Sequence, residues 1–136
     1  MARVLIVEDD ADIAEVTQRI LSRKGGHEVR VSQDVEEILA ACSRGEVDLV
    51  LMDISLRGVA YEGQPVDGIW ISRKLKSTPQ TSHIPVLLVT AHAMRGDRAR
   101  FLRESSADGY VTKPILDTDL FVQTVANHLP PSRRPA

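Results

Sequence analysis

The most reactive side chains of this sequence stand at the ends of apolar runs. An acidic triplet follows Val4–Val7, an aspartate follows residues 48–52, and polar residues end two later runs. These residues are Glu8, Asp9, Asp10, Asp53, Thr90 and Lys113. Each one alone has an ordinary interpretation as a helix cap, a strand residue or a solvated charge. The set gains a chemical meaning only if the fold brings the ends of these runs together.

A cluster of these side chains would favour metal-assisted phosphoryl chemistry. Carboxylates held close together repel, and their ionised forms are costly unless a cation joins them. Oxygen ligands without a nearby His or Cys favour a hard ion such as Mg²⁺. A Mg²⁺ next to a carboxylate and an ammonium group forms a site for a phosphoryl group. We therefore predict Asp53 as the phosphoryl acceptor and Asp9 as a metal ligand. Lys113 would supply the counter-charge, and Thr90 would contact a phosphoryl oxygen.

The elements that must position these residues alternate between apolar strands and amphipathic helices. Apolar runs predict strands at residues 4–7, 27–31, 48–52, 84–90 and 108–112. Periodic apolar positions predict a first helix that Asp10 or Asp12 caps and Gly25-Gly26 ends. Further helices are predicted at 35–42, 67–76, 93–105 and 116–128, and residues 58–66 are predicted to form a loop.

Five strand–helix repeats predict an α/β fold. We expect a doubly wound five-stranded parallel sheet with five helices and the flavodoxin-like strand order 2-1-3-4-5. Ligands of such sheets bind outside the carboxyl ends of the strands. In that order Asp53, Thr90, Lys113 and the acidic triplet line one edge of the sheet.

Length and charge exclude several classes of protein. The chain has 136 residues, with 17 basic and 19 acidic side chains and a net charge of −2. This length suits one domain, expected over residues 1–129 and followed by a flexible tail at 130–136. The charge balance argues against nucleic acid or a membrane surface as a partner. Val4–Val7 is too short for a signal peptide or a transmembrane helix.

The cysteine and the scattered histidines offer no further site. Cys42 is the single cysteine, which fits the reducing cytoplasm, and its helical position predicts a place in the core. His27, His83 and His128 have no carboxylate or cysteine at metal-ligand spacing, so we expect them at the surface.

Four stretches of the sequence resemble the response-regulator receiver domain. They are VLIVEDD (4–10), DLVLMDISL (48–56), IPVLLVTAHAM (84–94) and GYVTKPI (109–115). The resemblance covers roughly residues 3–129. The chain is similar to stand-alone receivers and to the receivers of hybrid histidine kinases, and the fold that this resemblance implies is the doubly wound one.

The resemblance implies roles for the residues around the acceptor. Asp53 becomes the phosphorylation site. Glu8 and Asp9 become the acidic pair that holds Mg²⁺, with Asp53 and the carbonyl of Ser55 as further ligands. The side chains of Ser55 and His92 occupy the two positions that tune the lifetime of the phosphate in this family.

Further roles concern the switch. Thr90 becomes the switch hydroxyl, and Tyr110 becomes the aromatic residue that turns inward when Thr90 is drawn to the phosphoryl group. Lys113 binds the phosphoryl group, and a cis peptide bond before Pro114 shapes its loop.

The implied function is phosphorylation-dependent switching in two-component or phosphorelay signalling. A histidine kinase or a histidine phosphotransfer protein donates the phosphoryl group to Asp53. The change at Thr90 and Tyr110 remodels the face of the fourth helix, fifth strand and fifth helix, which contacts a downstream protein or a second copy as a homodimer. The chain is expected to act in the cytoplasm as a switch, not as an enzyme, with self-catalysed phosphorylation and dephosphorylation.

Three alternatives remain open. One is a phosphorylation-independent pseudo-receiver that binds proteins, which the unusual Arg57 favours and the intact Asp53, Thr90 and Lys113 oppose. An aspartate-based phosphohydrolase often carries a second aspartate where Ser55 stands. A nucleotide binder would need a glycine-rich loop after the first strand, and that loop is absent.

The sequence departs from the receiver pattern at several positions. Arg57 stands where such domains usually have proline. About seven residues, 59–65 (VAYEGQP), are inserted before the following helix. Ser106 stands where a glycine commonly ends the fourth helix, and a non-glycine residue with positive φ costs about 1 kcal/mol.

Trp70 is a further departure, at a helix position that should face water. Its indole is either covered by Tyr61 or Val59 of the insertion, as a local packing device, or exposed as an anchor for a partner. We favour the packing interpretation.

Overall fold

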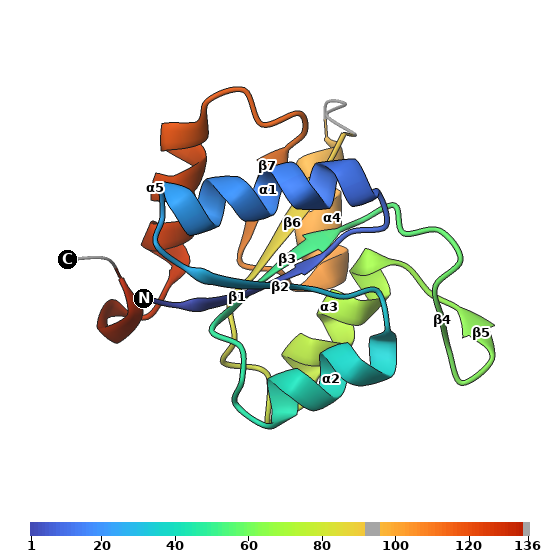
Figure 1. Cartoon of the computed structure of the whole chain (residues 1–136). Coiled ribbons are helices and arrows are strands. Elements are labelled where there is room, and N and C mark those ends of the chain that lie inside the picture. Colours follow the sequence, from blue (N-terminus) through green and yellow to red (C-terminus); the bar gives the residue numbers. More distant parts are fainter. Residues whose placement is uncertain (92–95, 135–136) are drawn as a thin grey trace.

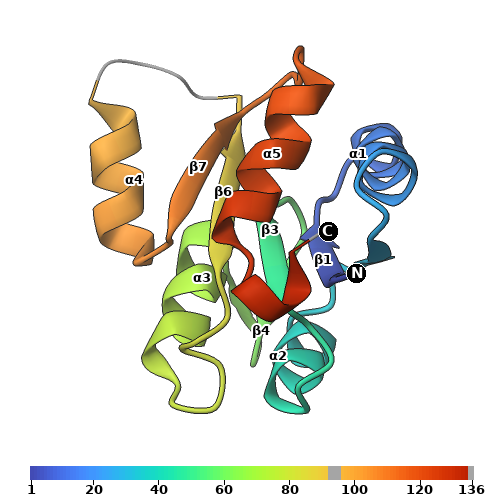
Figure 2. The ribbon, with the colours of Figure 1, turned by 90° about the vertical axis from the view of Figure 1, so that its left-hand side faces the viewer.

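The protein is described by a computed structural model that covers residues 1–91 and 96–134. A five-stranded sheet lies between two layers of helices (Figures 1 and 2). The sheet consists of β1 (Arg3–Val7), β2 (Glu28–Val31), β3 (Leu49–Asp53), β6 (Val86–Thr90) and β7 (Gly109–Thr112). The helices are α1 (Ala11–Arg23), α2 (Val35–Ser43), α3 (Gly68–Ser77), α4 (Asp97–Ser105) and α5 (Thr118–His128). None of the helices in the described ranges is long and apolar enough to cross a membrane.

The sheet has the topology that the alternation of elements predicted. Its spatial order is β2-β1-β3-β6-β7, and every neighbouring pair is parallel. This is the order 2-1-3-4-5 when its five strands are counted along the chain. The predicted doubly wound fold is therefore confirmed.

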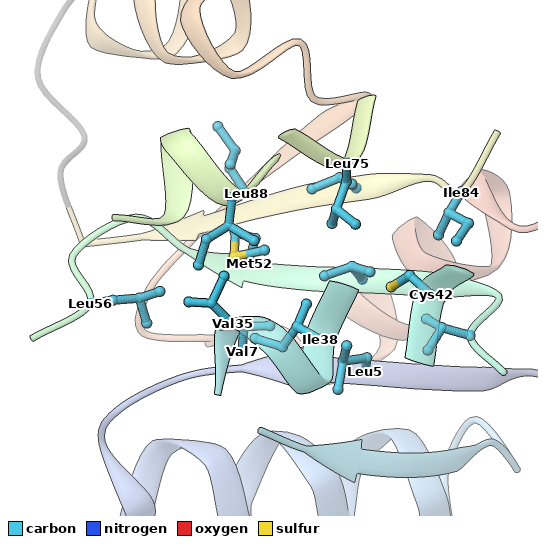
Figure 3. Packing of buried hydrophobic residues seen from close by; sticks show 14 of the residues in the cluster. Leu5, Val7, Val35, Ile38, Cys42, Met52, Leu56, Leu75, Ile84 and Leu88 are labelled. Carbon is cyan, nitrogen blue, oxygen red and sulfur yellow. The ribbon is translucent and has the colours of Figure 1, made fainter. Parts of the chain in front are cut away.

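Both faces of the sheet are buried, which explains why its central strands read as continuous apolar runs. Side chains alternate along β1, so that Leu5 and Val7 pack into one hydrophobic cluster while Val4 and Ile6 pack into another. Helices α2, α3 and α4 cover the first face, and α1 and α5 cover the second (Figure 2). Figure 3 shows the first cluster, in which Met52 of β3 lies centrally.

The structure confirms one expectation about isolated side chains and corrects another. Cys42 is fully buried in the first cluster, and this burial raises the pKa of its thiol to about 11. His27 is only 5% exposed, so the expected surface position was wrong. Its imidazole Nδ1 accepts a hydrogen bond from the Ala2 N–H at 3.3 Å. The imidazole ring fits against the backbone at Gly25 because glycine has no Cβ. A Cβ at this position would lie 2.7 Å from the His27 ring.

Aspartates start four of the helices. Asp10 is the N-cap of α1, where its Oδ1 accepts hydrogen bonds from the N–H groups of Asp12 and Ile13. Asp34, Asp67 and Asp117 cap α2, α3 and α5 in the same way. Each cap fixes the residue at which its helix begins.

The inserted segment is not the loop that we predicted at residues 58–66. It forms a hairpin of two antiparallel strands, β4 (Ala60–Tyr61) and β5 (Gln64–Pro65). Its turn residues Glu62 and Gly63 have φ values of 51° and 80°, which is the left-handed backbone that a tight two-residue hairpin turn requires. The sequence signal was weak because each strand has two residues and the turn lacks the usual Asn-Gly pair.

The start of the fourth helix needs a smaller correction, and the tail contains a short helix. Helix α4 was expected from residue 93, but residues 92–95 lie outside the described part, and the helix begins at Asp97. Residues 131–133, which lie inside the expected tail at 130–136, form a 3₁₀ helix, η1 (Pro131–Arg133). Arg134 donates hydrogen bonds to the Leu129 and Asn127 carbonyls, and Arg133 Nε lies 3.5 Å from an oxygen of Asp48. These contacts hold the start of the tail against the domain.

Candidate functional site

Three carboxylates converge at the carboxyl ends of β1 and β3. Glu8 and Asp9 follow β1, and Asp53 is the last residue of β3. The parallel register pairs Val7 with Met52, so the next residues along the two strands, Glu8 and Asp53, stand side by side. One oxygen from each of the three carboxylates lies within 4.8 Å of the others. Glu8 and Asp53 are buried, and Asp9 is half-buried.

Lys113, the residue directly after β7, brings a positive charge to this cluster. Its Nζ lies 2.9 Å from Glu8 Oε1 and 3.4 Å from Asp53 Oδ1. The Lys113 N–H donates to the Thr90 carbonyl at 2.8 Å, which ties the end of β7 to the end of β6. The Lys113–Pro114 peptide bond is cis, as the resemblance implied. The structure thus brings together residues that are 105 positions apart in the sequence.

The cluster holds more negative charge than Lys113 can balance. The pKa of Glu8 is raised to about 7, mainly by burial and secondly by the neighbouring Asp53. The hydrogen bond from Lys113 acts in the opposite direction and lowers this pKa. Burial alone would lower the pKa of Lys113, but its hydrogen bond to Glu8 and the nearby carboxylates raise it. Lys113 therefore stays protonated, and a further cation at the carboxylates would be stabilised.

The donor set fits Mg²⁺. Mg²⁺ binds oxygen ligands at about 2.1 Å, so two ligands on opposite sides of one ion lie about 4.2 Å apart. The three carboxylate oxygens are close enough for one ion after small side-chain adjustments. Ser55, the residue two positions after Asp53, is exposed.

Backbone N–H groups orient the acidic side chains. Asp53 Oδ1 accepts the Ser55 N–H at 3.2 Å, and Glu8 Oε2 accepts the Asp10 N–H at 3.3 Å. Asp9 Oδ2 accepts the N–H of Arg57, also at 3.2 Å. Sequence reasoning missed the Arg57 contact because a backbone donor leaves no trace in the side-chain pattern.

Gly68 is a second residue that sequence reasoning missed. It starts α3, and a Cβ at this position would lie 1.9 Å from the Asp53 carbonyl oxygen. Only glycine therefore lets α3 begin directly against the end of β3, where Asp53 stands. The available signal was a glycine immediately after the capping Asp67.

The predicted switch residues lie on neighbouring strands. Thr90 is buried at the end of β6, and Tyr110 is half-buried on β7. The register pairs Leu88 with Tyr110 and Thr90 with Thr112, so Thr90 and Tyr110 project from the same face of the sheet. The guanidinium of Arg98 on α4 lies 5.7 Å from the centre of the Tyr110 ring. His92, expected to tune the phosphate lifetime, lies outside the described residues.

Comparison with known proteins decides the family. The family model of the response regulator receiver domain matches residues 4–125 of the chain. The chain belongs to the response-regulator receiver domain family. Response regulator PleD of Caulobacter vibrioides is 39% identical over 125 residues, which are 90% of this chain and 25% of PleD. The polar-differentiation response regulator DivK of Brucella ovis is 32% identical over 126 residues, which are 93% of this chain and 94% of DivK.

Solved structures agree with this assignment. A CheY-like response regulator receiver domain protein from Methanospirillum hungatei superposes with a TM-score of 0.72 at 27% identity, covering 93% of each chain. This receiver domain spans a quarter of the length of PleD and 15% of the gliding motility regulatory protein of Myxococcus xanthus. Receiver domains are phosphoacceptor switches of two-component systems, which interact with histidine kinases or phosphotransfer proteins and with downstream targets.

Proposed function

We propose that this receiver domain accepts a phosphoryl group on Asp53, with Mg²⁺ held by Glu8, Asp9, Asp53 and the carbonyl of Ser55. The observation that carries this proposal is the placement of Lys113 Nζ against Glu8 and Asp53, inside a cluster of three carboxylates. A phosphoryl group on Asp53 would meet the ammonium group on one side and the metal ligands on the other. Within residues 1–91 and 96–134, no other group of three His, Cys, Asp or Glu side chains is close enough to hold a metal ion.

The donor is a phosphohistidine of a histidine kinase or of a histidine phosphotransfer protein. A carboxylate oxygen of Asp53 attacks phosphorus, and the P–O bond forms as the P–N bond to the donor imidazole breaks. Lys113 neutralises charge on the phosphoryl oxygens during this transfer. The Mg²⁺ ion, when bound, supplies further charge neutralisation and orients those oxygens.

These groups all belong to the receiver domain, so phosphorylation is self-catalysed and a small phosphodonor suffices. Attack of water on the phosphorus breaks its bond to the Asp53 oxygen, releases inorganic phosphate and returns Asp53 to its free carboxylate form. The side chains of Ser55 and His92 tune how long the phosphate lasts. We infer that the domain acts in the cytoplasm, where the thiol of Cys42 stays reduced.

Phosphorylation changes a protein-interaction face through Thr90 and Tyr110. The hydroxyl of Thr90 moves toward the phosphoryl group, and Tyr110 follows because both project from the same face of the sheet. The α4–β7–α5 face then binds a downstream protein or a second copy of the domain. Leu116 and Leu120 on this side are 88% and 62% exposed, which suits an apolar protein contact.

Phosphorylation by acetyl phosphate tests this function. Intact-mass spectrometry after incubation with Mg²⁺ should show the gain of one phosphoryl group, and EDTA should abolish it. The Asp53→Ala variant should gain none. A wild-type protein that gains no phosphoryl group and binds no fluoroberyllate would instead be a phosphorylation-independent binding module.

A further inference from the structure

Asp9 is held differently from the other two carboxylates. Glu8 and Asp53 both contact the ammonium group of Lys113, whereas Asp9 does not contact it. Among the described residues, the hydrogen bond to the Asp9 carboxylate comes from the backbone N–H of Arg57, which lies 48 positions further along the chain. The orientation of Asp9 therefore depends on where the backbone of Arg57 lies.

Buried residues fix the backbone on both sides of Arg57. Leu56 and Val59 are 9% and 7% exposed and belong to the hydrophobic cluster beneath α2 and α3, with Leu56 visible at its edge in Figure 3. Gly58 between them has a φ of 66°, a conformation that favours glycine. The Arg57 side chain itself is exposed, so its backbone is held by its neighbours.

The inserted hairpin secures the far end of this segment. The Val66 N–H donates to the Val59 carbonyl at 3.0 Å and closes the base of the hairpin. The ring of Tyr61 lies 5.2 Å from the ring of Trp70 on α3, which fastens the hairpin to the helix. The hairpin projects from the same end of the sheet as the carboxylates (Figure 1). It thereby restrains the segment that carries the Arg57 N–H.

We propose that Arg57 is a positioning residue for the metal ion and acts on Asp9 through its backbone N–H. The inserted hairpin restrains the backbone segment that carries this N–H group. The hydrogen bond engages one oxygen of Asp9 and restrains its carboxylate, an oxygen of which lies within 4.8 Å of oxygens of Glu8 and Asp53. Hydrogen bonds to a metal-binding carboxylate typically change metal affinity by about 10- to 100-fold. This inference rests on the proposed Mg²⁺ site. Proline, the usual residue here in the family, has no N–H to donate.

Two substitutions separate the backbone contribution from the charge of the side chain. Arg57→Pro removes both the N–H and the guanidinium group, whereas Arg57→Ala removes only the guanidinium group. Loss of a positive charge near the site favours a cation in both variants alike. The ratio of their Mg²⁺ dissociation constants therefore cancels the effect of the charge and reports the change at the backbone, which is the lost N–H group together with the fixed φ of proline.

Isothermal titration calorimetry with MgCl₂ alone measures these constants without any phosphodonor. We expect Arg57→Pro to bind Mg²⁺ about 10-fold or more weakly than Arg57→Ala, with both variants folded by circular dichroism. Equal dissociation constants in the two variants, with a wild-type protein that binds Mg²⁺, would overturn this inference alone. A wild-type protein that takes up no Mg²⁺ would overturn the proposed metal site and this inference with it.

The wild-type protein offers a second measurement, which does not require the proline variant to fold. The Arg57 amide resonance can be followed by NMR during a MgCl₂ titration, with the exposed amide of Gly63 at the hairpin tip as a control. We expect the Arg57 resonance to shift and saturate at the calorimetric dissociation constant. A resonance that stays unchanged at saturating Mg²⁺ would contradict the inference.

Discussion

Lys113 is the residue on which the electrostatics of the site depend most. Its ammonium group contacts two buried carboxylates, and its side chain is only 13% exposed. Removing one partner of a buried ion pair leaves an uncompensated charge and costs about 3 kcal/mol or more. The same ammonium group would meet the transferred phosphoryl group. Stability and reactivity therefore depend on a single side chain.

Lys113→Ala should lower the free energy of unfolding by about 3 kcal/mol in EDTA. It should also slow phosphorylation by acetyl phosphate by about 100-fold, because a charged donor to the phosphoryl oxygens is lost. Urea denaturation and time-resolved intact mass measure these two effects. Lys24→Ala is the matched control, since the ion pair of Lys24 with Asp119 is exposed, and it should change neither quantity. A Lys113 variant with wild-type kinetics would refute the proposed role.

His27 should make stability depend on pH. The pKa of His27 is lowered in the folded protein, mainly by burial and secondly by the N-terminal ammonium group. Folding therefore favours the neutral ring. This contribution is complete above the unfolded-state pKa of about 6.5 and is lost as the pH falls through the lower folded-state pKa. The raised pKa of Glu8 acts in the opposite direction over the same pH range, so the effect of His27 is the difference between two proteins. His27→Asn keeps an acceptor for the Ala2 N–H but cannot titrate, so the urea midpoint of the wild-type protein should fall relative to that of this variant on acidification below about pH 6.5. Parallel pH profiles of the two proteins would argue against this cause.

At the scale of elements, α4 ends in a strained residue. Ser106 caps the helix with a φ of 59°, as expected at a position where glycine is common. Ser106→Gly should raise the free energy of unfolding by about 1 kcal/mol, because glycine adopts this backbone without the steric cost. Ser106→Ala keeps the Cβ and should give no such gain. Denaturant titrations of the wild-type protein and the two variants measure these free energies of unfolding. A destabilised Ser106→Gly variant would contradict the interpretation that Ser106 is strained.

The contact between the hairpin and α3 supports the packing interpretation of Trp70. The Tyr61 and Trp70 rings lie 5.2 Å apart with an interplanar angle of 39°. Trp70→Ala should lower the free energy of unfolding by about 2 kcal/mol, less than for a fully buried tryptophan because the indole is half-buried. A double-mutant cycle with Tyr61→Ala should give a coupling of about 1 kcal/mol. Strictly additive losses would mean that the two rings do not stabilise each other.

At the scale of the whole molecule, the fold could be predicted because its signals repeat. Each buried strand reads as an apolar run, and each is followed by a polar residue that the parallel register carries to one edge. Asp53, Thr90 and Lys113 could be grouped in this way before any distance was known. The topology then supplied the contacts, such as the pairing of Lys113 with Glu8.

The remaining features depend on single contacts that no periodic pattern encodes. The hairpin consists of four strand residues and a left-handed turn, so its sequence reads as a loop. His27 is buried because Gly25 leaves room for its ring, a matter of local shape. The hydrogen bond from Arg57 to Asp9 involves a backbone group that every residue except proline carries.

Asp53 should be the residue that carries the phosphoryl group. Borohydride reduction of an aspartyl phosphate yields homoserine, so digestion and tandem mass spectrometry after treatment with acetyl phosphate and Mg²⁺ locate the modified residue. We predict homoserine at position 53, with Asp9 and the other aspartates unchanged, and none in a sample kept in EDTA. Modification at another aspartate, or an unmodified Asp53 at saturating Mg²⁺ and donor, would contradict the account.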